Sequence, residues 1–276
     1  MKSWTLLFSV LIGTGLQAQY YFNDIVSTRE VAQQMKAYTE NNVKRVVATG
    51  FTPQGQPTSE FSEVHEIVEN GRVLRITSRN PSLTITTYRF DEKGNLAVAT
   101  DSSEAVVSRT TYQYDALGNL VGVQNSIRDS ANDFNQLENH AWFYDASGKP
   151  TRMWRTINGS DSLEVRFTPD ESGNPGDERS YRRGLETGVV YYYFDDRNRL
   201  TDIVRYNKKA RRLLPDYMFE YDDQDRVIQK ITTTTSLDLG YLIWRFVFNE
   251  RGLKTKEALF SKDKQMTGKI EYAYSF

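Results

Sequence analysis

Bulky and polar residues alternate along most of this chain, and this period of two is typical of half-buried β-strands. Pairs of large side chains, mostly aromatic, stand two residues apart, so both members of a pair lie on the same face of a strand. The second member recurs at intervals of 23 to 30 residues, which is a unit of two strands and two turns. The pairs are Tyr88/Phe90, Tyr112/Tyr114, Trp142/Tyr144, Val165/Phe167, Tyr192/Phe194, Phe219/Tyr221, Phe246/Phe248 and Tyr272/Tyr274.

The residues that follow each pair predict a tight turn. Asp or Asn comes directly after the pair, and Gly, Asn or Asp comes three residues later. A type I turn favours these residues at its first and fourth positions, and the fourth residue of a hairpin turn often becomes left-handed and forms a bulge. The turn positions are Asp91, Gly94, Asp115, Gly118, Asp145, Gly148, Asp195, Asn198, Asp222, Asp225, Asn249 and Gly252. The copy at Phe167 carries two extra residues before Asp170, and we interpret it as the same turn.

A helix is predicted before the repeats. Ser27 and Glu30 have the spacing of a capping box, in which both side chains bond free backbone amides at a helix start. Met35 and Tyr38 then fall on one apolar stripe, and the helix is expected to end near residues 41–42. We expect this stripe to cover an open first edge of the sheet, with a partner-binding helix as the alternative.

The segments between helix and repeats read as an earlier, diverged hairpin. Residues 43–51 predict a strand and 52–58 a loop rich in Pro and Gly. Residues 61–68 and 72–77 flank Asn70-Gly71, a strong two-residue hairpin signal. The polar stretch 126–139 has no period and predicts a protruding loop.

Together these elements predict an all-β fold: a long, twisted antiparallel sheet of stacked hairpins with one N-terminal helix. The expected divisions are a signal peptide at 1–18, an extension with a capping helix at 19–42 and one repeat domain at 43–276. Whether the sheet closes into a barrel stays open at this point. A propeller is less favoured, because each unit supplies two strands and a blade needs four.

The repeat resembles the YD repeat of RHS proteins, which the teneurins also carry. The resemblance covers roughly residues 61–276, with the best matches at 88–96 and 112–120. It implies hairpins that wind into one continuous spiralling sheet, and large members of the family enclose a toxin. This chain is far shorter than those members, is expected to carry no further C-terminal domain and lacks the Asp-Pro-x-Gly type element associated with self-cleavage, so encapsulation is not implied.

The first residues have the pattern of an export signal. Lys2 precedes the apolar run 4–12, and small residues then lead to Ala18, after which cleavage is expected. The run is too short to span a membrane, and no later stretch predicts a transmembrane segment. The absence of cysteine excludes a lipid-anchored lipoprotein and a disulfide framework. We therefore expect a periplasmic or extracellular protein.

The balance of charges limits the classes of partner that we expect. The chain has 35 basic and 36 acidic residues, so no global charge favours nucleic acid or an anionic membrane. Aromatic residues make up 13% of the chain, and this content suits wide, half-buried strands.

No residue pattern predicts catalysis, a cofactor or a metal. His65 and His140 lack ligand spacing, and we interpret His140 as a hydrogen-bonded residue on the aromatic face. Calcium at the turn aspartates is disfavoured, because Lys or Arg occupies a middle position of some turns and would repel a cation. Paired carboxylates such as Asp195-Asp196 and Asp222-Asp223 point apart on a strand end, which argues against glycoside hydrolysis.

Basic residues recur with the repeat. Arg155, Arg182 and Lys209 stand 27 residues apart, so they are expected to stack in neighbouring repeats. We hypothesise a positive ridge for an anionic partner, namely envelope polysaccharide, lipid head groups or an acidic protein; the alternative is a solvated loop face. The ridge comprises Arg155, Arg182, Arg183, Lys208, Lys209, Arg211 and Arg212.

These observations favour a non-catalytic, exported structural or interaction protein of a bacterial envelope. The alternative is a ligand-binding module for carbohydrate or lipid, with a curved sheet lined by Tyr and Phe. The two differ in one respect: a ligand binder needs rings left uncovered in a concave pocket.

Overall fold

The computed structural model describes residues 19–80, 82–208, 210–233 and 240–276; the expected signal peptide and Lys209 lie outside these ranges. A π-helical turn (Tyr21–Val26) leads into α1 (Ser27–Glu40). The strands are β1 (Arg45–Phe51), β2 (Pro57–Val68), β3 (Val73–Asn80), β4 (Ser82–Phe90), β5 (Leu96–Ser102), β6 (Val106–Tyr114), β7 (Leu120–Asp129), β8 (Phe134–Tyr144), β9 (Pro150–Ile157), β10 (Asp161–Pro169), β11 (Pro175–Arg182), β12 (Leu185–Phe194), β13 (Leu200–Asn207), β14 (Arg212–Tyr221), β15 (Val227–Thr233), β16 (Tyr241–Phe248), β17 (Lys254–Phe260) and β18 (Met266–Ser275).

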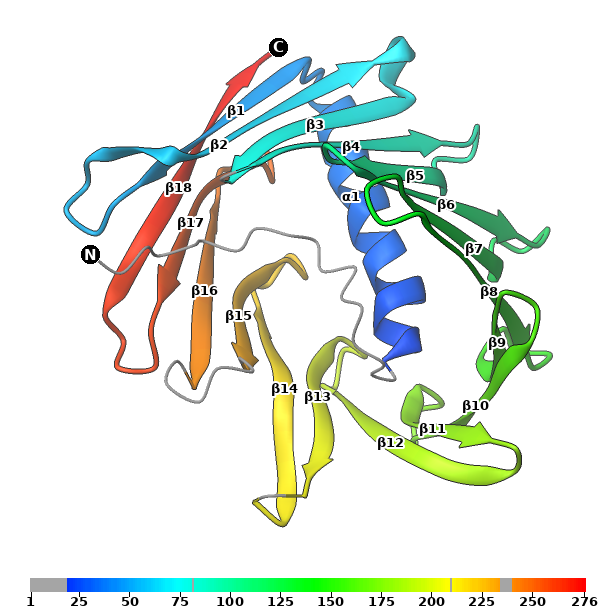
Figure 1. The fold of residues 1–276 in the computed structure, drawn as a ribbon. Helices are drawn as coiled ribbons and strands as arrows, with labels where there is room; N and C mark the ends of the chain where they lie inside the picture. Colours follow the sequence, from blue (N-terminus) through cyan, green and yellow to red (C-terminus); the bar gives the residue numbers. More distant parts are fainter. Residues whose placement is uncertain (1–18, 81, 209, 234–239) are drawn as a thin grey trace.

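These strands form one antiparallel sheet that closes into a barrel. Each strand pairs with the next along the chain, and β1 pairs with both β2 and β18 (Figure 1). The predicted antiparallel sheet of stacked hairpins is therefore confirmed. The expected open first edge is wrong, because closure satisfies the backbone donors and acceptors of β1 on both sides.

The repeat turns share one hydrogen-bond pattern. In the turn after β4 the Asp91 carboxylate accepts from the backbone N–H groups of Lys93 and Asn95, and the Gly94 N–H donates to the Asp91 carbonyl. Gly94 has a φ of 84°, and the strand register shifts beside Phe90, as expected of a bulge. The same left-handed position is filled by Gly118, Gly148, Gly173, Asn198, Asp225 and Gly252, so the copy with two extra residues makes the same turn.

The second aromatic residue of a pair also ties one repeat to the one before it. The Tyr144 hydroxyl donates to the Leu120 carbonyl at 2.7 Å, directly after the preceding turn. Equivalent bonds join Tyr114 to Leu96, Tyr221 to Leu200 and Tyr274 to Lys254. Since a buried carbonyl needs a donor, the hydroxyl explains tyrosine at these positions.

Antiparallel pairing places successive turns at alternate ends of the barrel. All the Asp- or Asn-led repeat turns, together with the loop 69–72, lie at one end, which we call the repeat rim. The other end carries turns of differing length and composition, and we call it the variable rim. Its described parts include residues 52–56, 103–105, 130–133, 158–160, 183–184 and 261–265.

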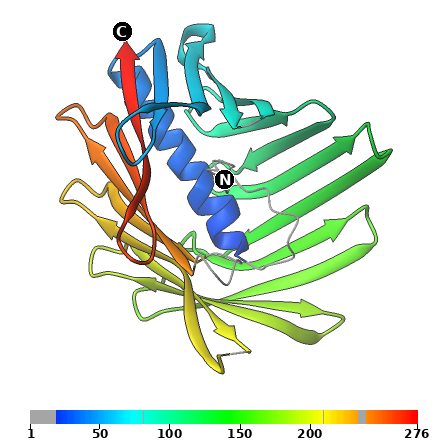
Figure 2. The ribbon, with the colours of Figure 1, turned by 60° about the vertical axis from the view of Figure 1, so that its left-hand side comes forward.

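The helix lies inside the barrel, enclosed by the ring of strands (Figure 2). Phe22 and Ile25 pack in one buried cluster with Trp142, while Met35 and Tyr38 pack in a second around β1 and β3–β5. Burying one such side chain contributes roughly 1.5–3 kcal/mol. A segment of the same chain therefore occupies part of the interior and packs against the wall.

Two local predictions are corrected. Ser27 is not a helix cap: helical residues precede it, its hydroxyl donates to the Phe22 carbonyl, and no capping bond to Glu30 forms because the backbone amides there are already in a helix. The stretch 126–139 is mostly strand, with a loop only at 130–133. Just before this stretch, Asn125 on the interior face of β7 donates to the hydroxyl oxygens of Ser108 and Thr110, so a polar residue is accommodated within a strand.

The hairpin at Asn70-Gly71 is present, but its loop spans four residues. Val68 pairs with Val73, and the Arg72 N–H donates to the Glu69 carbonyl. Glu69, Asn70 and Gly71 all have positive φ, so the turn needs more than the two residues that the pattern suggests.

Candidate functional site

The start of the helix is docked on a buried carboxylate. Glu178 on β11 accepts the backbone N–H of Tyr20 at 3.1 Å, the N–H of Tyr21 at 3.0 Å and the Tyr192 hydroxyl at 2.7 Å. Its side chain is fully buried, and burial raises the pKa of Glu178. Amide groups at a helix start have no partner within the helix, so the barrel wall supplies the cap that the helix sequence lacks.

A buried histidine joins the same end of the helix to the wall. His140 Nδ1 lies 2.6 Å from an Asp24 carboxylate oxygen, which also accepts the Trp142 indole N–H at 2.9 Å; His140 Nε2 lies 2.8 Å from Glu138. Burial lowers the pKa of His140, but the two carboxylates outweigh burial and raise it to about 9. At neutral pH the ring is an imidazolium between the Asp24 and Glu138 carboxylates, and it holds the start of the helix against the barrel wall.

The other histidine makes the corresponding contacts near the end of the helix. His65 Nδ1 lies 3.0 Å from the Tyr38 hydroxyl, and His65 Nε2 lies 2.5 Å from Glu63 on the same strand. Both histidines therefore use a Glu two residues earlier on their strand and one residue of the helix. Sequence reasoning missed this shared Glu-x-His spacing at 63–65 and 138–140, although it was visible.

A lysine projects into the aromatic interior. The Lys230 ammonium lies 5.0 Å from the ring centre of Tyr217, 5.6 Å from that of Phe22 and 5.7 Å from that of Phe219. Burial lowers the pKa of Lys230, whereas Glu30 and Glu257 oppose that shift. The cation is thus held by rings of the helix segment and of β14.

The structure divides the predicted basic residues between two settings. Arg155 points into the barrel, is 4% exposed and donates to the Tyr20 hydroxyl at 2.8 Å. Its Nη2 is also 3.9 Å from Asp161, and Arg182 donates to the same carboxylate at 2.6 Å. Arg155 and Arg182 therefore meet at Asp161, with Arg183 in the adjoining turn.

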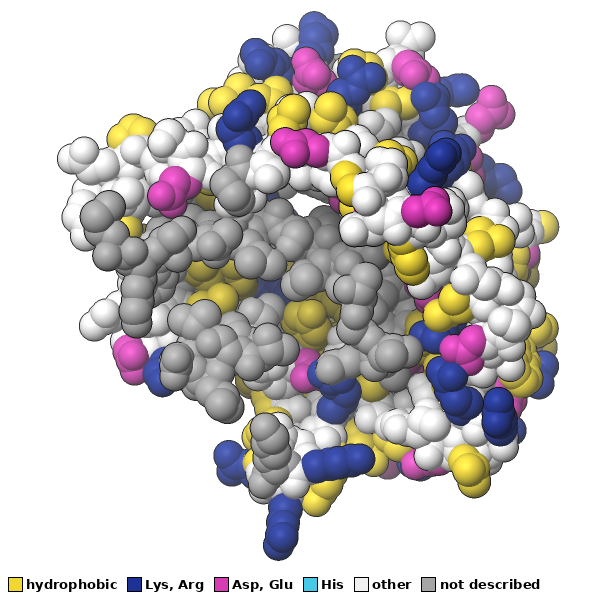
Figure 3. Space-filling model, viewed as in Figure 1, with side chains coloured by type: hydrophobic (Ala, Val, Ile, Leu, Met, Phe, Trp, Pro, Cys, Tyr) yellow, Lys and Arg dark blue, Asp and Glu magenta, His cyan; other side chains and the backbone are white. Residues whose placement is uncertain are grey.

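The remaining described basic residues lie at the tip of the next hairpin. Lys208, Arg211 and Arg212 are exposed on the β13–β14 hairpin, at the variable rim. Lys and Arg side chains gather around this tip, which protrudes at the bottom of Figure 3. The basic residues of the predicted ridge thus lie in two groups. One is exposed at the β13–β14 hairpin tip, and the other is partly buried around Asp161.

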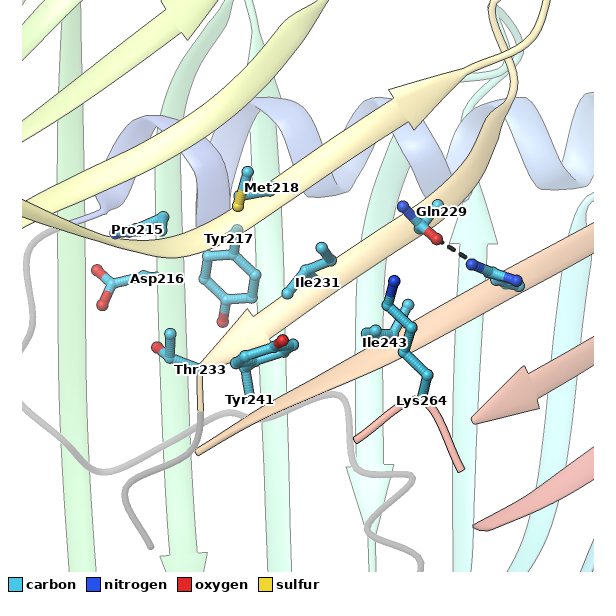
Figure 4. A pocket seen from close by; sticks show the side chains of 11 residues that line it. Pro215, Asp216, Tyr217, Met218, Gln229, Ile231, Thr233, Tyr241, Ile243 and Lys264 are labelled. Atoms are coloured by element: carbon cyan, nitrogen blue, oxygen red, sulfur yellow. Dashed lines mark hydrogen bonds between the residues drawn. The ribbon is translucent and has the colours of Figure 1, made fainter. Parts of the chain in front are cut away.

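An open groove lies on the outer face of β14–β16. Its volume is about 420 Å³, and Met218, Ile231 and Ile243 form its apolar floor. Tyr241 and Lys264 border it, and Arg245 donates to the Gln229 side chain at 2.9 Å beside it (Figure 4). The groove therefore mixes an apolar surface with a few polar groups.

Within the described ranges, acidic and histidine side chains do not assemble into a group of three or more suited to a metal ion. The turn aspartates accept backbone N–H groups, as Asp115 does from Leu117 and Asn119. No helix in the described part has the length and apolar character needed to cross a membrane.

The known structures that this chain resembles include distant likenesses from toxin complexes and porin-like proteins. No family model and no curated protein matches the chain. A chain of the Photorhabdus luminescens Tc holotoxin pore is 15% identical with a TM-score of 0.35, over 76% of this chain and 12% of that one. A porin-like protein from Bacteroides uniformis is 10% identical with a TM-score of 0.43, over 84% of this chain and 96% of that one.

A second porin-like protein, from Bacteroides vulgatus, is 11% identical with a TM-score of 0.35, over 84% and 98% of the two chains. The chain spans about an eighth of the toxin-complex chain it resembles. With identities and scores this low, functional inference depends on the residues of this chain.

Proposed function

We propose that this chain is a non-catalytic, exported scaffold of a bacterial cell envelope, built from YD-like repeats, that meets a partner through its variable rim. The single observation behind this proposal is the helix inside the barrel. It occupies the space that a ligand would take in a hollow aromatic sheet, and Glu178, His140 and His65 are engaged in holding it there.

The resemblance to YD repeats is supported by contacts within the repeat. The Asp or Asn side chain that leads a repeat turn accepts backbone N–H groups, and tyrosines of the pairs, such as Tyr144, bond the preceding repeat. Both contacts serve stability, and they account for the motif without any catalytic role. The ligand-binding alternative has less support, since most ring pairs belong to the two buried clusters.

The variable rim is the better candidate for recognition. Its turns have no common sequence, and its β13–β14 tip exposes three described cations, Lys208, Arg211 and Arg212. Turns that the fold does not constrain are free to carry specific contacts. An acidic protein or an anionic envelope polymer would complement this tip.

The test uses the chain expected after cleavage, residues 19–276, with photo-crosslinking to envelope fractions of the producing cell. Changing Lys208, Arg211 and Arg212 together to Gln should abolish the principal crosslinks. The matched control removes three exposed charges at the repeat rim, with Arg72→Gln, Lys93→Gln and Arg251→Gln, and should leave the crosslinks unchanged. Equal crosslinking by both triple variants would contradict recognition through the variable rim.

A further inference from the structure

A small polar pocket lies at the variable rim beside the β9–β10 turn. Its volume is about 280 Å³, and Ser160, Asp161, Ser162, Arg182 and Arg183 line it. The Asp161 and Arg182 side chains are each 41% exposed, so the pocket opens to solvent. It is separate from the outer groove on β14–β16.

The buried Arg155 lies behind this pocket and has hydrogen-bond donors without a partner. Arg155 uses Nη1 to bond the Tyr20 hydroxyl, whereas its Nε and Nη2 have no hydrogen-bond partner. Nη2 is directed to the Asp161 wall, 3.9 Å from the carboxylate. The hydroxyl of Ser180, which is 3% exposed on β11, is also without a partner. Buried polar groups left unpaired in this way are rare and call for a functional explanation.

The charges around the pocket favour an anion. The pocket lining has two arginines, Arg182 and Arg183, and one carboxylate, Asp161, so the lining itself is positive. Behind it Arg155 adds a further positive charge, which also faces the Glu138 carboxylate. Asp161 bridges Arg155 and Arg182 and so holds both guanidinium groups at the same wall. Arginine donates in a planar fork that matches the two oxygens of a carboxylate or phosphate.

We infer that this pocket binds one anionic oxygen group, a carboxylate or a phosphate, carried by a unit the size of a single sugar. Arg182 and Arg183 contact the anion from the open side, and Arg155 adds its charge from behind Asp161. The volume is slightly below the usual range of small-molecule sites, so it suits one monosaccharide-sized unit rather than a peptide. This inference builds on the proposed role of the variable rim and names a chemical class for it.

The test is titration calorimetry at low salt with glucuronate, glucose 6-phosphate, inorganic phosphate and glucose. Saturable binding is expected for anionic probes and not for glucose. Tighter binding of glucuronate would identify a uronate-type carboxylate as the source of the anion, and tighter binding of glucose 6-phosphate a sugar phosphate. Inorganic phosphate alone would point to the free ion, which contradicts the sugar-sized unit.

Variants assign the binding to the pocket. Arg182→Gln and Arg183→Gln should each weaken binding about tenfold or more, because each removes a charged hydrogen-bond donor. Arg155→Gln should also weaken it; should this variant fail to fold, the two exposed arginines still decide the matter. Arg109→Gln removes an exposed charge on β6 and should leave the affinity unchanged.

Absence of saturable binding by all three anionic probes would overturn the inference, and so would equal affinity in the Arg182→Gln and Arg183→Gln variants. Such a result leaves the proposed function standing, because the crosslinking test depends on Lys208, Arg211 and Arg212 at the neighbouring tip.

Discussion

The repeat sheet and the docked helix are stabilised in opposite ways. In the sheet the same turn and the same tyrosine bond recur many times, as Asp91, Asp115 and Tyr144 illustrate. The helix is instead held by a few polar contacts inside the barrel, as Glu178 and His140 illustrate. Losing one repeated contact should therefore cost little, whereas losing one docking contact should cost a great deal.

The largest effect is expected at Glu178. Glu178→Ala leaves the N–H groups of Tyr20 and Tyr21 and the Tyr192 hydroxyl without their acceptor inside the barrel. We expect the free energy of unfolding to fall by roughly 3–5 kcal/mol, measured by urea denaturation. The control Glu186→Ala removes an exposed carboxylate on β12 and should change stability by less than about 1 kcal/mol. Similar losses in both variants would refute the contrast.

The next effect depends on pH. The folded-state pKa of His140, about 9, lies above its ordinary value of 6.5, so the imidazolium contributes stability that is fully present below pH 6.5. That contribution declines as pH rises and is lost above about 9. The difference in unfolding free energy between the wild type and His140→Gln should shrink over this window by on the order of 3 kcal/mol. A difference that stays constant with pH would show that the ring acts without its charge.

Strain in a single repeat turn should lower the free energy of unfolding by less than either change above. Gly94 has a φ of 84°, and a Cβ added there would meet no atom within 4 Å, so Gly94→Ala tests backbone strain alone. We expect a loss of about 1–2 kcal/mol in unfolding free energy. Gly188 is equally uncrowded but has no positive φ, so Gly188→Ala is the matched control and should not destabilise the protein. Equal melting temperatures for the two variants would argue against a left-handed requirement at Gly94.

Loss of a single tyrosine hydrogen bond should lower the free energy of unfolding by about 1 kcal/mol. Tyr144→Phe removes the hydroxyl that donates to the Leu120 carbonyl, while the ring remains in place. The outward-facing Tyr193, which is 47% exposed, provides the control Tyr193→Phe, with no expected change in the denaturation midpoint. A cost as large as that of Glu178→Ala would remove the distinction between repeated and unique contacts.

The smallest effect is expected at the variable rim. The Gln triple at Lys208, Arg211 and Arg212 should change the free energy of unfolding by less than about 0.5 kcal/mol, since these side chains are exposed. Thermal denaturation checks this value. A large loss would mean that the tip supports the fold and would weaken its candidacy as a recognition surface.

Most of the sheet could be predicted because its signals are local. An Asp followed three residues later by Gly defines a turn through its own hydrogen bonds, as at Asp115 and Gly118. The candidate site was only partly predictable. Arg155 and Arg182 were selected by their spacing and Arg183 as a neighbouring basic residue, but Asp161, which brings the first two together, was not selected.

What the sequence determined by itself was the antiparallel hairpin and its period, because turn chemistry and side-chain alternation act within a few residues. Only the tertiary structure decided that β1 meets β18, that the helix lies within the ring and that Glu178 caps it. Those contacts join residues more than 150 positions apart, and they depend on how the accumulated twist of many strands closes. No short-range pattern encodes that closure.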